Sequence, residues 1–374
     1  MAKPKISQVV MLEHSKAKVD LFKRYFSVYL NIMNRTPFVD KVFLYDLFAG
    51  EGKYIDGGKG SPIVAMECIK DHFFSNNRTC PNIDVWFNDF SKSQIEKEKF
   101  KIDRVNEFVQ AIYKPENVNV QFTKFDSAEI LSEIHKQLNN LDNKQRALLF
   151  IDPWGYKDIK PTELKAILAN KKTEIILFLP ISFMYRFADK ALVDNTFKGG
   201  KPLEEFLTNL FGGKTPDTKN QIKFIEEVKN EFKKFLEIKY VDTFTIERGS
   251  GNFFCLFFFT NNKTGYYKML DSKWDLDEVG GRGFKIGSNQ GSMFDEIAAV
   301  DYSSMIKDFI KANGKITNQQ IFDFGLENGF LPKHTKKVLD QLKDSIELIS
   351  MDERPTKGYY IDDNHERKIQ IKLK

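Results

Sequence analysis

Residues 42–52 read Val-Phe-Leu-Tyr-Asp-Leu-Phe-Ala-Gly-Glu-Gly, an apolar run that ends in an acidic residue and two glycines. The apolar part, Val42 to Leu47, predicts a short buried strand, and the glycine-rich residues Gly50 to Gly60 predict a loop. Ser61 and Pro62 fit an N-cap followed by proline at the first helical position. Such a turn lets the backbone approach a ligand closely. Taken alone, it is equally compatible with an ordinary strand-to-helix connection.

The same alternation of apolar runs and amphipathic segments continues on both sides of this turn. An amphipathic helix is predicted over residues 14–35, ahead of the first strand. Further strands are predicted at Ile83–Phe87, Val118–Phe125, Ala147–Ile151 and Glu174–Leu179, with helices at Ser91–Phe108, Glu129–Leu138 and Pro161–Leu168. Strands that alternate with helices predict an α/β fold with a parallel sheet covered on both faces.

Beyond Phe187 the pattern changes. Residues Leu203–Leu236 are predicted to be helical, and Tyr240–Arg248 and Phe253–Thr260 are predicted to pair around a turn at Gly249-Ser-Gly251. This pair suits an antiparallel edge on a mixed sheet. Residues 275–302 are rich in Gly, Asp and Ser and are interpreted as a linker.

The segment Ser303–Lys374 is predicted to form a separate winged helix. Its first helix carries Met305 to Ile310, a capping box at Thr317 starts the second, and the third covers about Pro332 to Lys343. Two short strands are expected at Ile346–Ile349 and Gly358–Ile361. The sequence therefore predicts two domains, residues 1–290 and 291–374.

Composition narrows the class of protein. Of 374 residues, 41% are hydrophobic and 29% are charged, as in ordinary globular proteins. No apolar run is long enough for a membrane helix, and the start does not resemble a signal peptide, so we expect a cytoplasmic protein without membrane contact. The 3 cysteines and 5 histidines are scattered, so no metal site is expected. The net charge of +5 permits nucleic-acid binding without requiring it.

Acidic residues follow three of the predicted parallel strands. Asp46 is placed to bind a cationic amine or order a water, and Asp89 to accept hydrogen bonds from ribose hydroxyls. Asp126, with Ser127, is placed where an adenine amine is read. The alternative for Asp89 and Asp126 is a capping carboxylate at a helix N-terminus. The three positions together favour a nucleoside site.

The fourth strand is followed by Asp152-Pro-Trp-Gly-Tyr156. Proline fixes the backbone there, the carboxylate can accept hydrogens from a planar amine, and an aromatic neighbour can stack on its ring. The alternative is a Pro-Gly turn with a packed tryptophan.

These motifs together resemble S-adenosylmethionine-dependent methyltransferases, and within them most closely the three-Cys-motif partner family. The resemblance rests on the Lys18–Tyr25 helix, Asp46-Leu-Phe-Ala-Gly50, Gly60-Ser-Pro62 and Phe150-Ile-Asp-Pro-Trp-Gly-Tyr156. It implies a Rossmann-like methyltransferase sheet, S-adenosyl-L-methionine as cofactor, and a winged helix at the C-terminal end. The three cysteines of the family name belong to a partner, so a cysteine-motif radical-type partner protein is also implied.

The resemblance implies two sets of site residues. The implied cofactor-binding residues are Lys18, Asp46, Phe48, Ala49, Gly50, Gly52, Asp89, Asp126 and Ser127. The implied catalytic residues are Asp152, Pro153, Trp154 and Tyr156. Nucleic-acid amino-methyltransferases carry Asp/Asn-Pro-Pro-aromatic here, whereas this chain has Trp154 in place of the second proline, followed by Gly155. Either Trp154 or Tyr156 is then the stacking residue.

Two functions remain open. The first is methyl transfer to an amino nitrogen of a nucleic-acid base. The second is a cofactor-binding scaffold or sensor that recruits a partner enzyme through the winged helix without methyl transfer. Trp154 in place of the second proline of the motif favours this second function. The candidate nucleic-acid contacts in the winged helix are Lys333, Lys336 and Lys337 of the third helix, beside His334, and Lys357 of the wing. Acidic residues flank the wing, so a protein–protein role for this domain is nearly as well supported.

Overall fold

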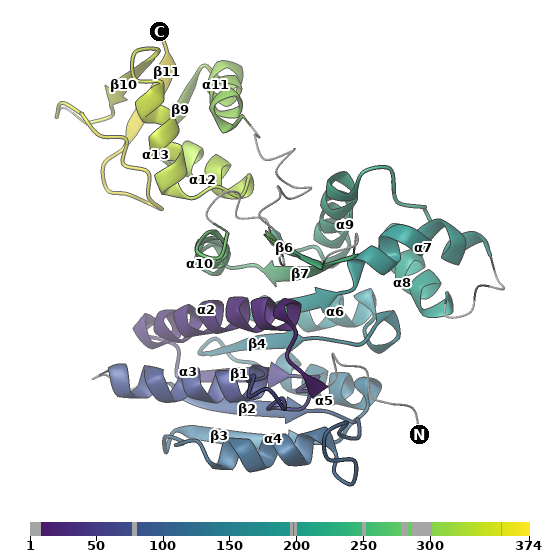
Figure 1. Cartoon of the computed structure of the whole chain (residues 1–374). Coiled ribbons are helices and arrows are strands. Elements are labelled where there is room, and N and C mark those ends of the chain that lie inside the picture. Colours follow the sequence, from purple (N-terminus) through teal and green to yellow (C-terminus); the bar gives the residue numbers. More distant parts are fainter. Residues whose placement is uncertain are drawn as a thin grey trace. The chain divides into compact units, whose positions relative to one another are not determined.

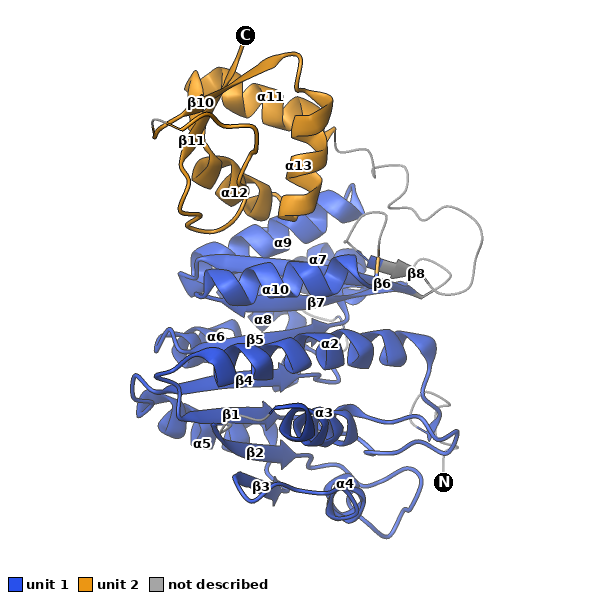
Figure 2. Cartoon of the chain, turned by 90° about the vertical axis from the view of Figure 1, so that its left-hand side faces the viewer, with its two compact units in different colours: residues 1–276, 282–287 blue, residues 277–281, 288–374 orange. Residues whose placement is uncertain are grey.

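The structure is a computed structural model. It describes residues 9–76, 81–194, 197, 200–248, 252–277, 283–285, 301–352 and 354–374. The chain divides into two compact units, Met1–Leu276 with Arg282–Gly287, and Asp277–Gly281 with Ser288–Lys374, coloured separately in Figure 2.

The first unit is built on an eight-stranded sheet in the order β3-β2-β1-β4-β5-β7-β6-β8 (Figure 1). The strands are β1 (Lys41–Asp46), β2 (Asn82–Asn88), β3 (Val118–Thr123), β4 (Gln145–Ile151), β5 (Thr173–Leu179), β6 (Tyr240–Arg248), β7 (Asn252–Thr260) and β8 (Gly283–Lys285). Strands β1 to β5 are parallel, and β7 runs antiparallel to both β5 and β6. The order reverses between β1 and β4, which is where open α/β sheets bind ligands.

Helices cover both faces of this sheet. One layer holds α2 (Glu13–Arg35), α3 (Ser61–Ser75), α4 (Lys101–Gln110) and α10 (Lys263–Trp274), which lie in front of the sheet in Figure 2. The other layer holds α5 (Ser127–Asn139), α6 (Pro161–Leu168), α7 (Ile181–Val193), α8 (Lys201–Phe211) and α9 (Gln221–Leu236). Each layer packs on its own hydrophobic core, as the parallel strand pattern predicts.

Aromatic residues of α2 explain why this helix forms before the first strand. Phe22, Tyr25, Phe26 and Tyr29 recur at three- and four-residue steps, and all are at most 2% exposed. The ring of Phe22 lies 4.6 Å from that of Phe150 on β4. Burying each of these side chains contributes roughly 1.5–3 kcal/mol. The middle of α2 is thereby held against the sheet.

The helix predicted over Ser91–Phe108 is wrong in its first half. Helix α4 begins only at Lys101, and residues 91–100 form turns. The hydroxyl of Ser93 accepts the backbone N–H groups of Ile95 and Glu96, at 3.1 and 2.9 Å. A serine that binds nearby backbone competes with helix formation.

The region after α9 differs in detail from the expectation. The β6–β7 pair is antiparallel as predicted, but β7 lies inside the sheet, between β5 and β6. The predicted turn at 249–251 lies outside the described residues. So does most of the predicted linker, residues 278–282 and 286–300, whereas β8 within it is a strand that pairs with β6 and was not predicted.

The second unit contains a winged helix. Its elements are α11 (Tyr302–Asn313), β9 (Lys315–Thr317), α12 (Asn318–Glu327), α13 (Pro332–Gln341), β10 (Ile346–Ser350) and β11 (Ile369–Leu373). The capping box at Thr317 is present. The strand predicted at Gly358–Ile361 is wrong, because the chain returns through β11, which pairs with both β10 and β9. Alternate residues Ile369 and Ile371 of β11 are fully buried, which places this strand in the core.

The predicted fold class, an α/β Rossmann-like methyltransferase sheet with a C-terminal winged-helix domain, is therefore confirmed. Among the described residues, no helix is both long and apolar enough to cross a membrane.

Removing the winged helix is expected to leave the sheet unit folded. Within the described part of the chain, both hydrophobic cores of the sheet unit consist of residues between Met11 and Leu276. A chain that ends before Asp301 should therefore keep its far-ultraviolet circular dichroism per residue and melt in one cooperative transition. An insoluble or non-cooperative truncated chain would show that the tail completes the core of the sheet unit.

Candidate active site

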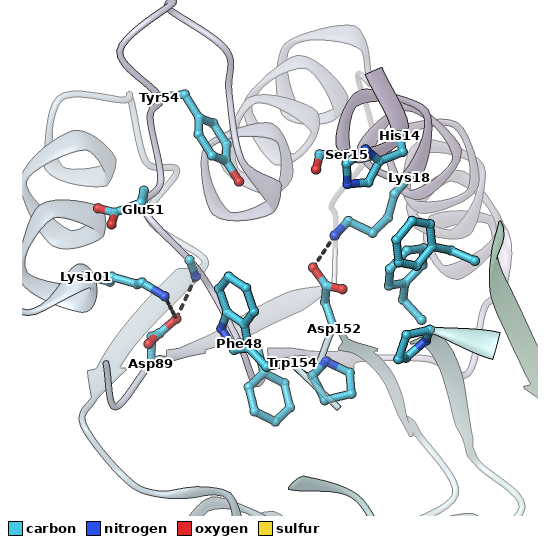
Figure 3. A pocket seen from close by; sticks show the side chains of 15 residues that line it. His14, Ser15, Lys18, Phe48, Glu51, Tyr54, Asp89, Lys101, Asp152 and Trp154 are labelled. Carbon is cyan, nitrogen blue, oxygen red and sulfur yellow. Dashed lines mark hydrogen bonds and ion pairs between the residues drawn. The ribbon is translucent and has the colours of Figure 1, made fainter. Parts of the chain in front are cut away.

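A cavity of about 230 Å³ opens at the carboxyl edge of the parallel strands (Figure 3). Its walls come from α2, from the segments after β1, β2, β4 and β5, and from the start of β7. The lining residues are His14, Ser15, Lys18, Phe48, Gly50, Glu51, Tyr54, Asp89, Lys101, Asp152, Pro153, Trp154, Phe178, Pro180 and Phe254.

The glycine turn after β1 forms the floor of this cavity. Gly50 has φ +67°, a conformation that favours glycine, and its N–H donates to Oδ2 of Asp89 at 2.9 Å. The loop then folds back, since the N–H of Gly60 donates to the carbonyl of Gly52 at 2.6 Å. A Cβ atom at Gly60 would lie 3.0 Å from that carbonyl oxygen. Glycine is thus required at Gly50 by its backbone conformation and at Gly60 by the close approach of the loop to itself.

A buried ion pair fastens the same loop. The guanidinium of Arg104 on α4 donates to the carboxylate of Glu51 and, at 2.9 Å, to its backbone carbonyl. The same carboxylate accepts the hydroxyl of Ser93 at 2.7 Å. Both charged side chains are almost fully buried, so removing either partner leaves an uncompensated charge.

Asp46, the last residue of β1, is 1% exposed and does not itself line the cavity. Its Oδ2 accepts the hydroxyl of Ser61 at 2.6 Å, whereas its Oδ1 has no hydrogen-bond partner among the described residues. Burial, together with the charges of Asp152 and Asp89, raises the pKa of Asp46 from an ordinary value of 3.8 to about 7, against the opposing hydrogen bonds from the Ser61 hydroxyl and the Phe48 backbone. Asp89 and Asp152 are therefore both close enough for their charges to act on the carboxylate at the end of β1.

Lys18 and Asp152 form an ion pair on one wall of the cavity (Figure 3). The side chains are only 11% and 23% exposed. The ammonium group of Lys18 also lies 4.6 Å from the centre of the Phe178 ring. The resemblance assigned Lys18 to the cofactor and Asp152 to catalysis, and the structure places the two in direct contact.

The two aromatic residues of the motif after β4 have different surroundings. Trp154 lines the cavity and is 62% exposed, with the ammonium group of Lys101 5.2 Å from its ring. Tyr156 is buried, its hydroxyl donates to the carbonyl of Pro180 at 3.1 Å, and it lines a neighbouring cavity of about 410 Å³. Of these two aromatic residues, Trp154 is therefore the one that lines the same cavity as Asp152.

The structure brings most of the predicted site residues together. Lys18, Phe48, Gly50, Asp89, Asp152, Pro153 and Trp154 line one cavity. Ala49 lies buried behind it, and its N–H donates to the carbonyl of Asn88 at 2.9 Å. Gly52 has φ +69° and turns the loop without lining the cavity.

Asp126 and Ser127 do not line this cavity. The carboxylate of Asp126 accepts the backbone N–H groups of Ala128 and Glu129, at 3.0 and 2.9 Å, and so caps α5. This is the capping role that the sequence left as the alternative. Ser127 is the first residue of the same helix.

In the winged helix, Lys333, Lys336 and Lys337 are exposed on α13, and Lys357 is exposed between β10 and β11. Their neighbour His334 does not add to this positive charge. Its Nδ1 accepts the N–H of Leu331 at 3.1 Å, and burial lowers its pKa to about 4, helped by Lys333 and Lys337.

Several residues of the cavity were not predicted from the sequence. Phe178 and Phe254 lie at strand ends on this edge, so the strand pattern contained a signal for them. Glu51 and Arg104 are 53 positions apart, and Lys101 follows the irregular residues 91–100. Nothing in the local sequence indicates those contacts.

Comparison with known proteins adds one domain assignment. Residues 285–353 match the model of the GMT-like wHTH domain, which agrees with the winged helix. A search of curated protein sequences finds no match at a significant level.

Three solved structures superpose on the chain at low similarity. A DUF574 family protein from Streptomyces avermitilis has 10% identity and a TM-score of 0.33, covering 66% of this chain and 83% of its own. Loganic acid methyltransferase with SAH has 10% identity and a TM-score of 0.28, covering 62% and 74%. The B. subtilis m1A22 tRNA methyltransferase TrmK has 9% identity and a TM-score of 0.25, covering 84% and 93%. TM-scores this low carry no inference, so the fold rests on the chain's own strand order.

The buried carboxylate of Asp46 predicts a pH dependence of stability. Because its folded pKa of about 7 exceeds the ordinary 3.8, the folded state holds the proton more tightly, and stability falls as the pH rises from about 4 to about 7. The loss is on the order of 4 kcal/mol. Asp46→Asn keeps an acceptor for Ser61 and removes the charge, so it should become more stable than the wild type across this pH window.

Urea unfolding followed by tryptophan fluorescence measures this effect in the sheet unit, because Trp86, Trp154 and Trp274 all lie there. Asp189→Asn, at an exposed position of α7, is the matched control and should not change the pH profile. A stability difference between Asp46→Asn and wild type that is constant with pH would contradict the prediction.

Proposed function

We propose that this chain is an S-adenosyl-L-methionine-dependent methyltransferase that acts on an amino nitrogen of a nucleic-acid base. The observation that carries the proposal is the grouping of Asp46, Asp89 and Asp152 at the carboxyl edge of the sheet, where the strand order reverses and where Asp89 accepts the N–H of Gly50. Carboxylates that gather in a half-buried cavity favour a cationic ligand, and this cofactor carries a sulfonium and an ammonium group.

The residues of the cavity fit the proposed cofactor. The unpartnered Oδ1 of Asp46 is a buried acceptor without a donor among the described residues. Asp89 follows β2 and retains lone pairs beyond those used by Gly50 and Ser91, so ribose hydroxyls can be bound there. Phe48 and Phe178 supply apolar walls. When bound, the cofactor supplies an electrophilic methyl group on its sulfur.

The chain's own part in the reaction is binding, orientation and exclusion of water. Trp154 is exposed at the cavity and offers a face on which a planar base can stack, as the sequence motif predicts. The exposed lysines of α13 are candidates for contacts with nucleic-acid phosphates. We also expect a cytoplasmic location and, from the resemblance to the three-Cys-motif partner family, a cysteine-motif radical-type partner protein.

A second candidate function is a cofactor-binding scaffold or sensor without methyl transfer. The Lys18–Asp152 ion pair favours it, because a carboxylate already paired with an ammonium group is less available to an acceptor amine. The domain matched as a GMT-like wHTH domain would then recruit the partner enzyme.

Isothermal calorimetry tests cofactor binding. We expect the wild type to bind S-adenosylmethionine and S-adenosylhomocysteine, and Asp89→Ala to lose roughly 1.5–3 kcal/mol because charged hydrogen bonds disappear. Asp84→Ala is the control, since Asp84 lies on β2, the strand that Asp89 follows, and pairs with Lys41 away from the cavity. A wild type that binds neither compound would exclude both proposed functions.

Tritiated methyl transfer separates the two functions. The enzyme hypothesis predicts label in DNA or RNA with the wild type and none with Asp152→Ala. Label that persists in this variant would exclude the assigned site. Cofactor binding without label in any nucleic acid would support the scaffold.

A triple variant, Lys333→Gln with Lys336→Gln and Lys337→Gln, tests the winged helix in the same assay. It should keep cofactor binding. Its loss of methyl transfer relative to the wild type should be largest at low salt, because phosphate contacts are electrostatic. Unchanged transfer at every salt concentration would remove these lysines from substrate recognition.

A further inference from the structure

Two pairs of opposite charges face each other across the cavity (Figure 3). Lys18 and Asp152 occupy one wall, and Lys101 and Asp89 occupy the other. Glu51 also lines the cavity but is paired with Arg104, so the charges around the cavity are balanced and suit a ligand that itself carries both signs. The two pairs differ in how fully their carboxylates are already bonded.

The carboxylate of Asp89 serves the protein's own backbone. Its Oδ2 accepts the N–H of Gly50 at 2.9 Å and its Oδ1 accepts that of Ser91 at 2.8 Å, while Nζ of Lys101 stays 3.9 Å away. These bonds fix the glycine turn. Asp89 can therefore still accept hydrogen bonds from ligand hydroxyl groups, but its carboxylate is fixed in place by the backbone N–H groups that it already binds.

Asp152 is bonded differently. Its one hydrogen-bond partner within the described part of the chain is the ammonium group of Lys18, which Oδ2 accepts. Its other carboxylate oxygen and the remaining N–H groups of Lys18 are left for a ligand. Pro153, next in the chain, also lines the cavity and restricts the backbone beside Asp152.

We propose that Lys18 and Asp152 together bind the amino-acid end of the cofactor, Lys18 its carboxylate and Asp152 its ammonium group. This inference rests on the proposed cofactor and assigns Asp152 to cofactor binding instead of to the acceptor amine.

Electrostatics support this arrangement. When the carboxylate lies beside Lys18 and the ammonium group beside Asp152, the four charges alternate in sign around a square. The protein pair need not separate, and the site stays neutral when it is filled. A half-buried ion pair contributes little to stability on its own, because desolvation offsets its attraction, so its place in the cavity wall is better explained by a ligand.

The aromatic surroundings define the site further. Nζ of Lys18 lies 4.6 Å from the Phe178 ring centre, and Phe178 stacks on Phe254 at 5.2 Å. These rings occupy one side of the ammonium group, so an anion approaches it from the side of the cavity. The amino-acid end is thereby directed to the wall formed by α2 and β5, and the nucleoside end to Gly50 and Asp89.

Four ligands test the assignment by calorimetry. S-adenosylhomocysteine carries both charged groups, S-adenosyl-3-thiopropylamine lacks the carboxylate, S-adenosyl-4-thiobutyric acid lacks the amine, and 5′-methylthioadenosine lacks the whole amino-acid end. The variants are Lys18→Met and Asp152→Asn, and the matched control is Lys16→Met, at an exposed position on the same helix.

Lys18→Met should weaken binding of the two ligands with a carboxylate by roughly 10- to 100-fold, and Asp152→Asn that of the two ligands with an amine by a similar factor. Binding of 5′-methylthioadenosine should stay within about twofold in both variants, which also shows that they fold. Lys16→Met should match the wild type with every ligand.

If a variant loses affinity equally for all four ligands, the assignment is overturned, and the Lys18–Asp152 ion pair has a structural role only. Unchanged binding of S-adenosylhomocysteine in Asp152→Asn overturns the role of Asp152 alone and returns it to the acceptor side. Failure of all four ligands to bind the wild type overturns the proposed cofactor, and the assignment with it.

Discussion

The carboxylate of Asp46, buried at the end of β1 with one oxygen unsatisfied, is the constraint on which the site depends. Removing a charge from water is costly unless it gains a partner, and here Ser61 satisfies only one oxygen. The same strand end must also accommodate Asp89 and Asp152 nearby. The sheet edge therefore stores unfavourable electrostatic energy that a bound cation would relieve. A cationic ligand that binds the folded chain at this side chain would therefore also add to its stability.

Two ion pairs stabilise the walls of the pocket around this edge of the sheet. Arg104 neutralises Glu51 and holds the glycine loop, and Lys18 neutralises Asp152 on the opposite wall. Each carboxylate next to the cavity thus has a different compensation: a hydroxyl for Asp46, backbone N–H groups for Asp89, and a lysine for Asp152. These differences allow carboxylates of the same chemistry to have different roles within one cavity.

The fold was largely predictable because its strands are continuous apolar runs, and the ends of parallel strands meet at one edge. That argument also placed Asp46, Asp89 and Asp152 together. It failed at residues 91–100, where the side chain of Ser93 replaces helical bonds, and at the wing, where the pairing strand is Ile369–Leu373. The Glu51–Arg104 pair was not foreseeable, since its members meet only in the folded chain. Asp126 satisfied the same pattern as Asp89, and only the structure separates a cap from a cavity wall.

The position of β7 between β5 and β6 has a consequence for assembly. Strand β6 is synthesised before β7. It is nevertheless linked to the parallel strands through β7, which pairs with β5 on one side and with β6 on the other. Strands β6 and β7 are close in sequence, whereas β7 pairs with β5, which is much earlier in the chain, so the attachment to the parallel sheet is non-local. Because Phe254 of β7 lines the cavity, the pocket is complete only after this last step. A nascent chain can have most of the sheet in place and still lack one wall of the binding site.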